Sequence, residues 1–184
     1  MYVSSSEGVT NFQFTFGVPL NVLTNWTVTS QSAQLASATL LTLDSAIQLN
    51  LQTLPGQVLQ GTQAVARLDF IATTNPPSQF LHLQLTNLTG LKPGGIIYSN
   101  SVKGGGRVAV VQDKPLIETT LTPDQSRRVW VYTQPGLNCE LFSTTNLIPP
   151  IYWTPTVTFI QTNIATPIDV PDTNNMIYYR VRQQ

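Results

Sequence analysis

The stretch Gly61-Thr-Gln-Ala-Val-Ala-Arg-Leu-Asp-Phe70 decides the fold class of this chain. Read in steps of two, the positions from Ala64 to Phe70 are apolar, whereas Arg67 and Asp69 stand at alternate positions. Successive side chains of a β-strand point to opposite faces, so this alternation is typical of a strand with one face in a core. The stretch therefore predicts a single half-buried strand whose charged side chains face solvent.

The same unit, a short alternating strand followed by a polar turn, recurs on both sides of this stretch. The pattern predicts strands at residues 8–16, 26–29, 40–43, 46–51, 80–85, 96–98, 108–111, 115–121, 127–132, 138–142, 156–160 and 176–182. A helix over residues 32–43 is an alternative because alanine is frequent there, but Ser and Thr dilute the pattern and favour strands. Strands at roughly ten-residue spacing predict an all-β fold with two β-sandwich domains in tandem, of jelly-roll or immunoglobulin-like type.

The composition shifts around residues 112–115, and we expect the boundary between the two domains there. The first domain is expected at residues 9–112 and the second at residues 113–184. The polar segment 1–8 lies before the first predicted strand, and it is either an N-terminal arm or a frayed end.

Charged residues make up only 10% of the chain, against roughly 25% in an average soluble domain, and the formal net charge is zero. A surface of neutral polar groups is common in secreted and cell-surface β-proteins, so we expect an extracellular location. Nucleic acid is not expected as a partner, because counterion release needs clustered Lys and Arg. No apolar run approaches the roughly 20 residues of a membrane span, so membrane insertion is not expected either.

The first domain, over residues 9–111, resembles a cohesin-type domain of bacterial extracellular proteins. The resemblance rests on the Phe-Gln-Phe-Thr-Phe strand ending at Phe16, on Ile47-Gln-Leu-Asn-Leu51, and on the run from Pro55 to Phe70. This group shares a jelly-roll-like sandwich with several carbohydrate-binding modules. The resemblance implies a non-catalytic binding domain.

The second domain resembles a small fibronectin type III-like domain found near the C-termini of large secreted bacterial proteins. Its matching segments are Pro135-Gly136, Glu140–Leu147, Trp153-Thr-Pro155 and Tyr178-Tyr-Arg-Val181. This family is not catalytic by itself, so the resemblance implies a binding, display or cell-adhesion role.

The sequence contains few combinations of residues that are typical of a catalytic site. His82 is the one histidine, which excludes a site built on several histidines, and the nine carboxylates are scattered without an evident pair for glycoside hydrolysis. Cys139 has no intrachain partner for a disulfide, and we expect it to be a small apolar residue in a strand. The chain is therefore not expected to be an enzyme.

Calcium is one cofactor that the sequence leaves open. Asp169, Asp172 and Asn174 stand on a predicted turn, and Ca²⁺ prefers six to eight oxygen ligands of this kind. Asp and Asn also build turns by bonding to their own backbone, and the spacing of an EF-hand loop is missing. The segment is thus either a simple turn or a weak calcium site.

Aromatic side chains are the remaining candidates for ligand binding, because sugar rings stack on the faces of Trp and Tyr. Trp130 and Tyr132 share one face of their predicted strand, and Tyr152 and Trp153 follow a Pro-Pro turn. We take these four residues as the candidate aromatic platform, although a Trp of a sandwich can also fill its core.

Two functional hypotheses follow. The first is a non-catalytic extracellular module that binds a polysaccharide or a cell-surface protein. The second is a structural or adhesive subunit, such as a spacer, a surface-layer component or a filament protein that self-associates through strand edges.

Overall fold

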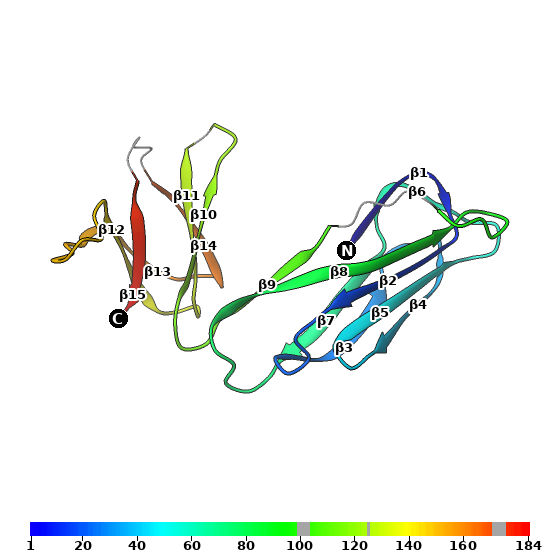
Figure 1. The fold of residues 1–184 in the computed structure, drawn as a ribbon, viewed down its shortest axis with the longest axis horizontal. Coiled ribbons are helices and arrows are strands. Elements are labelled where there is room, and N and C mark those ends of the chain that lie inside the picture. The colour runs from blue at the N-terminus through cyan, green and yellow to red at the C-terminus, as the bar shows by residue number, and fades with distance from the viewer. Residues whose placement is uncertain (99–103, 125, 171–175) are drawn as a thin grey trace. The chain divides into compact units, whose positions relative to one another are not determined.

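The computed structural model describes residues 1–98, 104–124, 126–170 and 176–184. Every regular element in these ranges is a β-strand, which confirms the predicted all-β class (Figure 1). None of the described residues forms a helix of the length and apolar character that a membrane crossing requires. Contacts within the chain divide it into two compact units. Unit 1 comprises Met1–Thr74 and Leu81–Val108, and unit 2 comprises Asn75–Phe80 and Ala109–Gln184.

Unit 1 is built on a five-stranded sheet in which β2 is the central strand. The order is β4 (Leu35–Thr42), β5 (Ala46–Thr53), β2 (Asn11–Gly17), β8 (Gln79–Leu91) and β9 (Gly106–Val110). Strand β2 alternates as predicted, because Phe12, Phe14 and Phe16 are all buried in the core cluster of this unit. The preference for a strand over a helix at residues 32–43 is also confirmed, because β4 occupies Leu35–Thr42.

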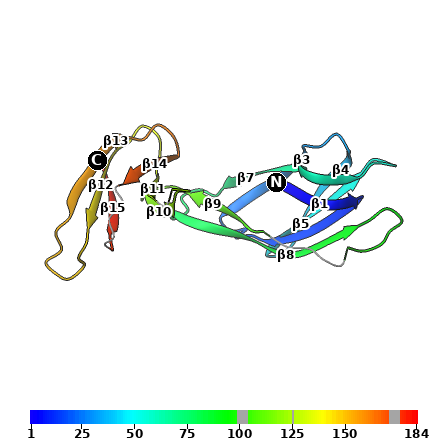
Figure 2. The same cartoon turned by 90° about the horizontal axis from the view of Figure 1, so that it is seen from above.

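Two strand pairs face this sheet across the core. β1 (Tyr2–Val9) pairs with β6 (Leu59–Ala64), and β3 (Leu23–Ser30) pairs with β7 (Ala66–Ala72). Figure 2 shows β3 and β7 as the layer opposite β8. Apolar residues from both layers form one cluster, so unit 1 is a β-sandwich.

The stretch from Gly61 to Phe70 is two strands, not the single strand that its alternation predicts. β6 ends at Ala64 and β7 begins at Ala66, and the fully buried Val65 lies between them. The backbone N–H of Val65 donates to the carbonyl of Met1, while its own carbonyl accepts from Gln31. The chain changes its pairing partner here from β1 to β3, and a period-two pattern does not register such a change.

The polar N-terminal segment is a paired strand and not a free arm. Tyr2 pairs with Ala64 and Ser5 with Gly61 along β1 and β6, and the N-terminal ammonium of Met1 donates to the carbonyl of Ala66 at 2.8 Å. Val3 packs against the core cluster. The alternation of small and apolar residues in this segment was too weak to indicate a strand.

Unit 2 is a sandwich of two three-stranded antiparallel sheets. One has the order β10 (Leu116–Leu121), β11 (Arg127–Tyr132), β14 (Ala165–Val170), and the other has the order β13 (Thr154–Ile160), β12 (Asn138–Thr144), β15 (Tyr178–Gln183) (Figure 1). Val129 and Val131 of the first sheet and Leu141 of the second are completely buried in one cluster between them.

Strand β14, which contains Pro167, was not predicted from the sequence. Proline cannot donate to a strand ladder and is confined to edge strands, and β14 is an edge strand of its sheet. In contrast, the short strand predicted at residues 96–98 is reduced to an isolated bridge between Leu91 and Ile97.

Candidate functional site

The four predicted aromatic residues lie on two opposite outer faces of unit 2. Trp130 and Tyr132 alternate with the buried Val129 and Val131 along β11, so both project from the outer face of the sheet β10-β11-β14. Tyr152 and Trp153 immediately precede β13, which belongs to the other sheet. The two sheets pack against each other through their inner faces, so their outer faces point in opposite directions. The four residues therefore do not form one platform.

Polar side chains of the neighbouring strand β10 contact both Trp130 and Tyr132, and the Tyr132 ring also lies edge-to-face against Phe80, with 5.2 Å between the ring centroids. The indole Nε1 of Trp130 donates to Oγ1 of Thr120 at 3.2 Å, and the Tyr132 hydroxyl donates to Oε2 of Glu118 at 3.0 Å. Both aromatic rings are half-buried. We call this surface the aromatic face: Trp130, Tyr132, Glu118, Thr120, Arg128 and Asp169.

Arg128 and Asp169 extend the aromatic face beyond Trp130. They are cross-strand partners on β11 and β14, and Trp130 is the next residue on the same side of β11. Nε and Nη2 of Arg128 donate to the two carboxylate oxygens of Asp169 at 2.6 and 3.1 Å. The hydrogen bond from Arg128 lowers the pKa of Asp169, and the same bond raises the pKa of Arg128. A fixed pair of charged groups thus borders the indole ring.

Trp153 is engaged on the opposite side of unit 2. The guanidinium of Arg180 lies 4.6 Å from the centroid of the Trp153 ring and 4.8 Å from that of Phe142. Arg182 lies over the same Phe142 ring at 5.3 Å and forms an ion pair with Glu140 at 2.6 Å. One face of the indole ring is therefore covered by a side chain of the protein, whereas Tyr152 is 78% exposed.

The predicted calcium ligands are only partly placed. Both oxygens of Asp169 are taken by Arg128, and Asp172 and Asn174 lie outside the described residues. Within the described ranges, no group of three or more His, Cys, Asp or Glu side chains gathers at one place. Calcium binding at this turn stays a prediction.

The two remaining single residues of interest are ordinary strand residues. Cys139 is completely buried on β12, and burial raises the pKa of its thiol. His82 lies exposed on β8, on the side opposite to Leu81 and Leu83.

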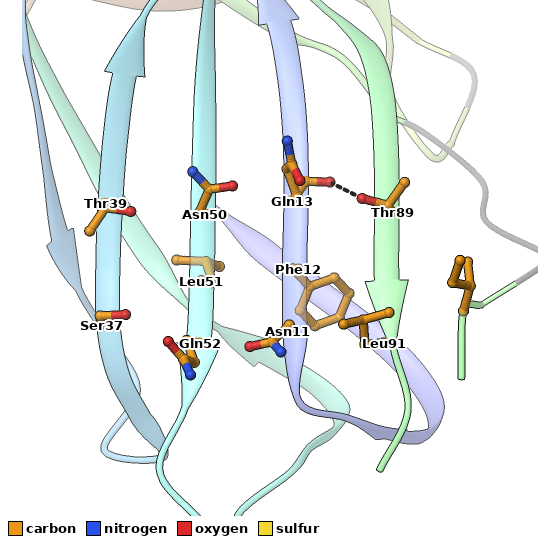
Figure 3. Close-up of a pocket in the computed structure, with 11 residues that line it drawn as sticks. Asn11, Phe12, Gln13, Ser37, Thr39, Asn50, Leu51, Gln52, Thr89 and Leu91 are labelled. Carbon is orange, nitrogen blue, oxygen red and sulfur yellow. Dashed lines mark hydrogen bonds between the residues drawn. The ribbon is translucent and has the colours of Figure 1, made fainter. Parts of the chain in front are cut away.

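Unit 1 carries a groove on the outer face of its five-stranded sheet that the sequence reading did not identify. It has a volume of 620 Å³ and crosses β4, β5, β2 and β8. Its polar side chains are Asn11, Gln13, Ser37, Thr39, Asn50, Gln52 and Thr89 (Figure 3). The sequence does contain a pattern that indicates this groove. Side-chain amides occupy successive outward positions of two strands, at Asn11 and Gln13 on β2 and at Gln48, Asn50 and Gln52 on β5.

Strand register arranges these side chains in two rows. One row runs from Ser37 through Gln52 and Asn11 to Leu91, and the next runs from Thr39 through Asn50 and Gln13 to Thr89. Figure 3 shows both rows projecting from the same face of the sheet. None of the residues that line the groove is charged.

Comparisons with known proteins find a similarity among solved structures and none by sequence family. No family model matches the sequence, and no curated protein matches it. Among solved structures, the chain is similar to a cohesin module from the family 33 glycoside hydrolase of Clostridium perfringens ATCC13124. That similarity has 12% sequence identity and a TM-score of 0.47, and it covers 55% of this chain and 73% of that chain.

Proposed function

We propose that this chain is a non-catalytic extracellular module that binds carbohydrate through the aromatic face of unit 2. The observation that carries the proposal is the placement of Trp130 and Tyr132. They lie two residues apart on the outer face of a central strand, and each makes a hydrogen bond that holds its ring in place.

The chemistry of this face matches a sugar ring. The C–H groups of a pyranose are attracted to the negative face of an aromatic ring, and both surfaces lose water on contact. The hydroxyl groups of a sugar need donors and acceptors at the rim of the ring. Glu118 and the Arg128–Asp169 pair bring both kinds of group beside the two aromatic rings.

An extracellular location is supported by the composition and by the sequence resemblances. The low content of charged residues leaves a neutral polar surface, which is typical of secreted β-proteins. The cohesin-like and fibronectin type III-like patterns both belong to families of secreted bacterial proteins. The expected partner is therefore a polysaccharide or the glycan of a cell surface.

The test is retention on a panel of polysaccharides that includes cellulose, xylan, chitin, mannan and pectin. Trp130→Ala is expected to lower the affinity of the retained polysaccharide about tenfold or more, as truncation of a central aromatic contact does. Trp153→Ala is the matched control on the opposite face and is expected to bind as the wild type does. Failure of every polysaccharide to retain the wild type, or equal binding by both variants, would contradict the proposal.

A second candidate function, self-association through strand edges, is favoured by two exposed apolar residues. The side chain of Leu121 on β10 is 71% exposed, and that of Ile160 on β13 is 63% exposed. Among the described residues, β10 and β13 are each an edge strand of a three-stranded sheet. Open edges with apolar side chains are templates for pairing with another chain. Light scattering over a dilution series tests this function. Growth that Leu121→Lys and Ile160→Lys together suppress supports it, and a monomer at every concentration rejects it.

A further inference from the structure

We infer that the groove on the five-stranded sheet of unit 1 is a second binding site, and that it takes an uncharged, hydroxyl-rich chain such as a neutral oligosaccharide. This site shares no residue with the aromatic face and lies in the other compact unit. The inference therefore goes beyond the proposed function, and binding at this groove can be tested independently of binding at the aromatic face.

The centre of the groove is a cross-strand pair of amides. Gln13 on β2 and Asn50 on β5 are register partners, and both face outward because Phe12, Phe14 and Leu51 face the core. Oδ1 of Asn50 accepts from Nε2 of Gln48 at 3.3 Å, which orients the Asn50 amide and leaves its nitrogen for a ligand. The sheet thus holds this pair on rigid strands and not on a loop (Figure 3).

The polar groups around this centre have unused hydrogen-bonding capacity. Within the part of the chain that the structure describes, the side chains of Asn11, Gln13, Thr39 and Gln52 make no hydrogen bond to another residue. Each side-chain amide offers two donors and one acceptor oxygen, and each hydroxyl both donates and accepts. A sugar hydroxyl also donates and accepts, so the hydroxyls of a sugar chain can pair with the amides and hydroxyls that line the groove.

Charge and polarity argue against other ligand classes. The lining carries no cation, so phosphate or nucleic acid gains nothing from it. Protein interfaces centre on aromatic, Met or Arg anchors, and the centre of this groove has amides in their place. Its volume of 620 Å³ falls within the range of small-ligand sites.

One end of the groove adds an apolar contact. Leu91 and Ile97 are bridge partners, and the Ile97 side chain is 68% exposed. An apolar wall beside polar rows suits the face of a sugar ring, which carries C–H groups, while its rim of hydroxyls meets the amides. The arrangement favours a chain that lies across the strands from β4 to β8.

The test is isothermal titration with neutral hexasaccharides of the cello, xylo and manno series, using the Trp130→Ala protein so that the aromatic face is disabled. We expect saturable binding of at least one hexasaccharide, and a loss of tenfold or more in affinity when Gln13→Ala and Asn50→Ala are added. Thr15→Ala with Asn87→Ala is the matched control, because this pair faces outward on β2 and β8 outside the groove lining. Melting temperatures confirm that all variants fold.

Each alternative outcome decides the question. Absence of binding by the Trp130→Ala protein, or binding that the Gln13 and Asn50 changes leave intact, overturns the groove site without touching the aromatic face. Stronger binding of a hexagalacturonate than of the neutral chains overturns the ligand class. Binding of an uncharged Gly-Ser-Asn peptide in place of every hexasaccharide assigns the groove to a protein partner and also overturns it.

Discussion

The indole Nε1 of Trp130 donates a hydrogen bond to Oγ1 of Thr120, 3.2 Å away on the neighbouring strand. Thr120 is the register partner of Arg128, so the bond runs diagonally across β10 and β11. A diagonal bond of this kind turns the ring toward one side and fixes its plane. The aromatic face is thereby organised before any ligand arrives, which reduces the ordering cost of binding.

Replacing Thr120 by Val tests this preorganisation. The two side chains have nearly the same shape, and Val is as compatible with a strand as Thr, so the fold is expected to stay intact. Loss of one neutral hydrogen bond is expected to weaken polysaccharide binding about two- to tenfold. Titration calorimetry and a thermal melt measure the two effects. An unchanged affinity beside a strong effect of Trp130→Ala would show that the bond does not position the ring.

The Arg128–Asp169 pair predicts a pH dependence of stability. Arg128 lowers the pKa of Asp169 in the folded protein below its ordinary value of about 3.9. The pair therefore stabilises the fold above the unfolded-state pKa, and this contribution is lost as the pH falls through the folded-state pKa. The Asp169 side chain is 67% exposed, so the effect is small.

Melting temperatures of the wild type and of Asp169→Asn measure this dependence. We expect a small deficit in the variant at neutral pH, which begins to shrink near pH 4 and is lost once the pH falls below the lowered folded-state pKa of Asp169. Asp44→Asn, at an exposed position in unit 1, serves as the control for the loss of one carboxylate. A deficit that persists unchanged in acid would contradict the electrostatic origin of the contribution.

The N-terminal strand predicts a large effect of truncation. Removal of residues 1–7 deletes most of β1, the partner of β6 in its two-stranded sheet, and removes Val3 from the core. We expect a lower melting temperature and concentration-dependent association, because the edge of β6 becomes open. Ser4→Ala is the surface control. A truncated protein with the melting temperature and oligomeric state of the untruncated protein would contradict this role of β1 and would support the arm or frayed end that the sequence predicted.

The thiol of Cys139 is expected to be inert in the folded protein. It is completely buried, and its raised pKa keeps it protonated, whereas thiolate is the reactive form. Labelling with a thiol reagent at neutral pH should be slow in buffer and fast in denaturant. Rapid labelling of the native protein would show that β12 opens readily.

Local alternation predicted the features that depend on one strand at a time. Phe12, Phe14 and Phe16 face the core as their spacing indicates, and Trp130 and Tyr132 share an outer face for the same reason. Strand β14 was not predicted. It contains Pro167, and a proline is compatible with a strand only at the edge of a sheet, a position that the local sequence does not indicate.

Features that depend on pairing could not be read from one segment. The break at Val65 follows from an exchange of partner strands, and the amide rows follow from the register of four strands. The split of the four aromatic residues between two faces depends in the same way on which strands share a sheet.

The measurement that tests the central claim most directly is the response of the indole N–H signals in a two-dimensional nitrogen–proton spectrum. The chain has three tryptophans, and the indole of Trp26 donates to the Leu23 carbonyl in the other unit. Titration with oligosaccharides from the retained polysaccharide should shift the Trp130 signal and leave those of Trp26 and Trp153 in place. A titration that reaches saturation without moving the Trp130 signal would contradict carbohydrate binding at the aromatic face.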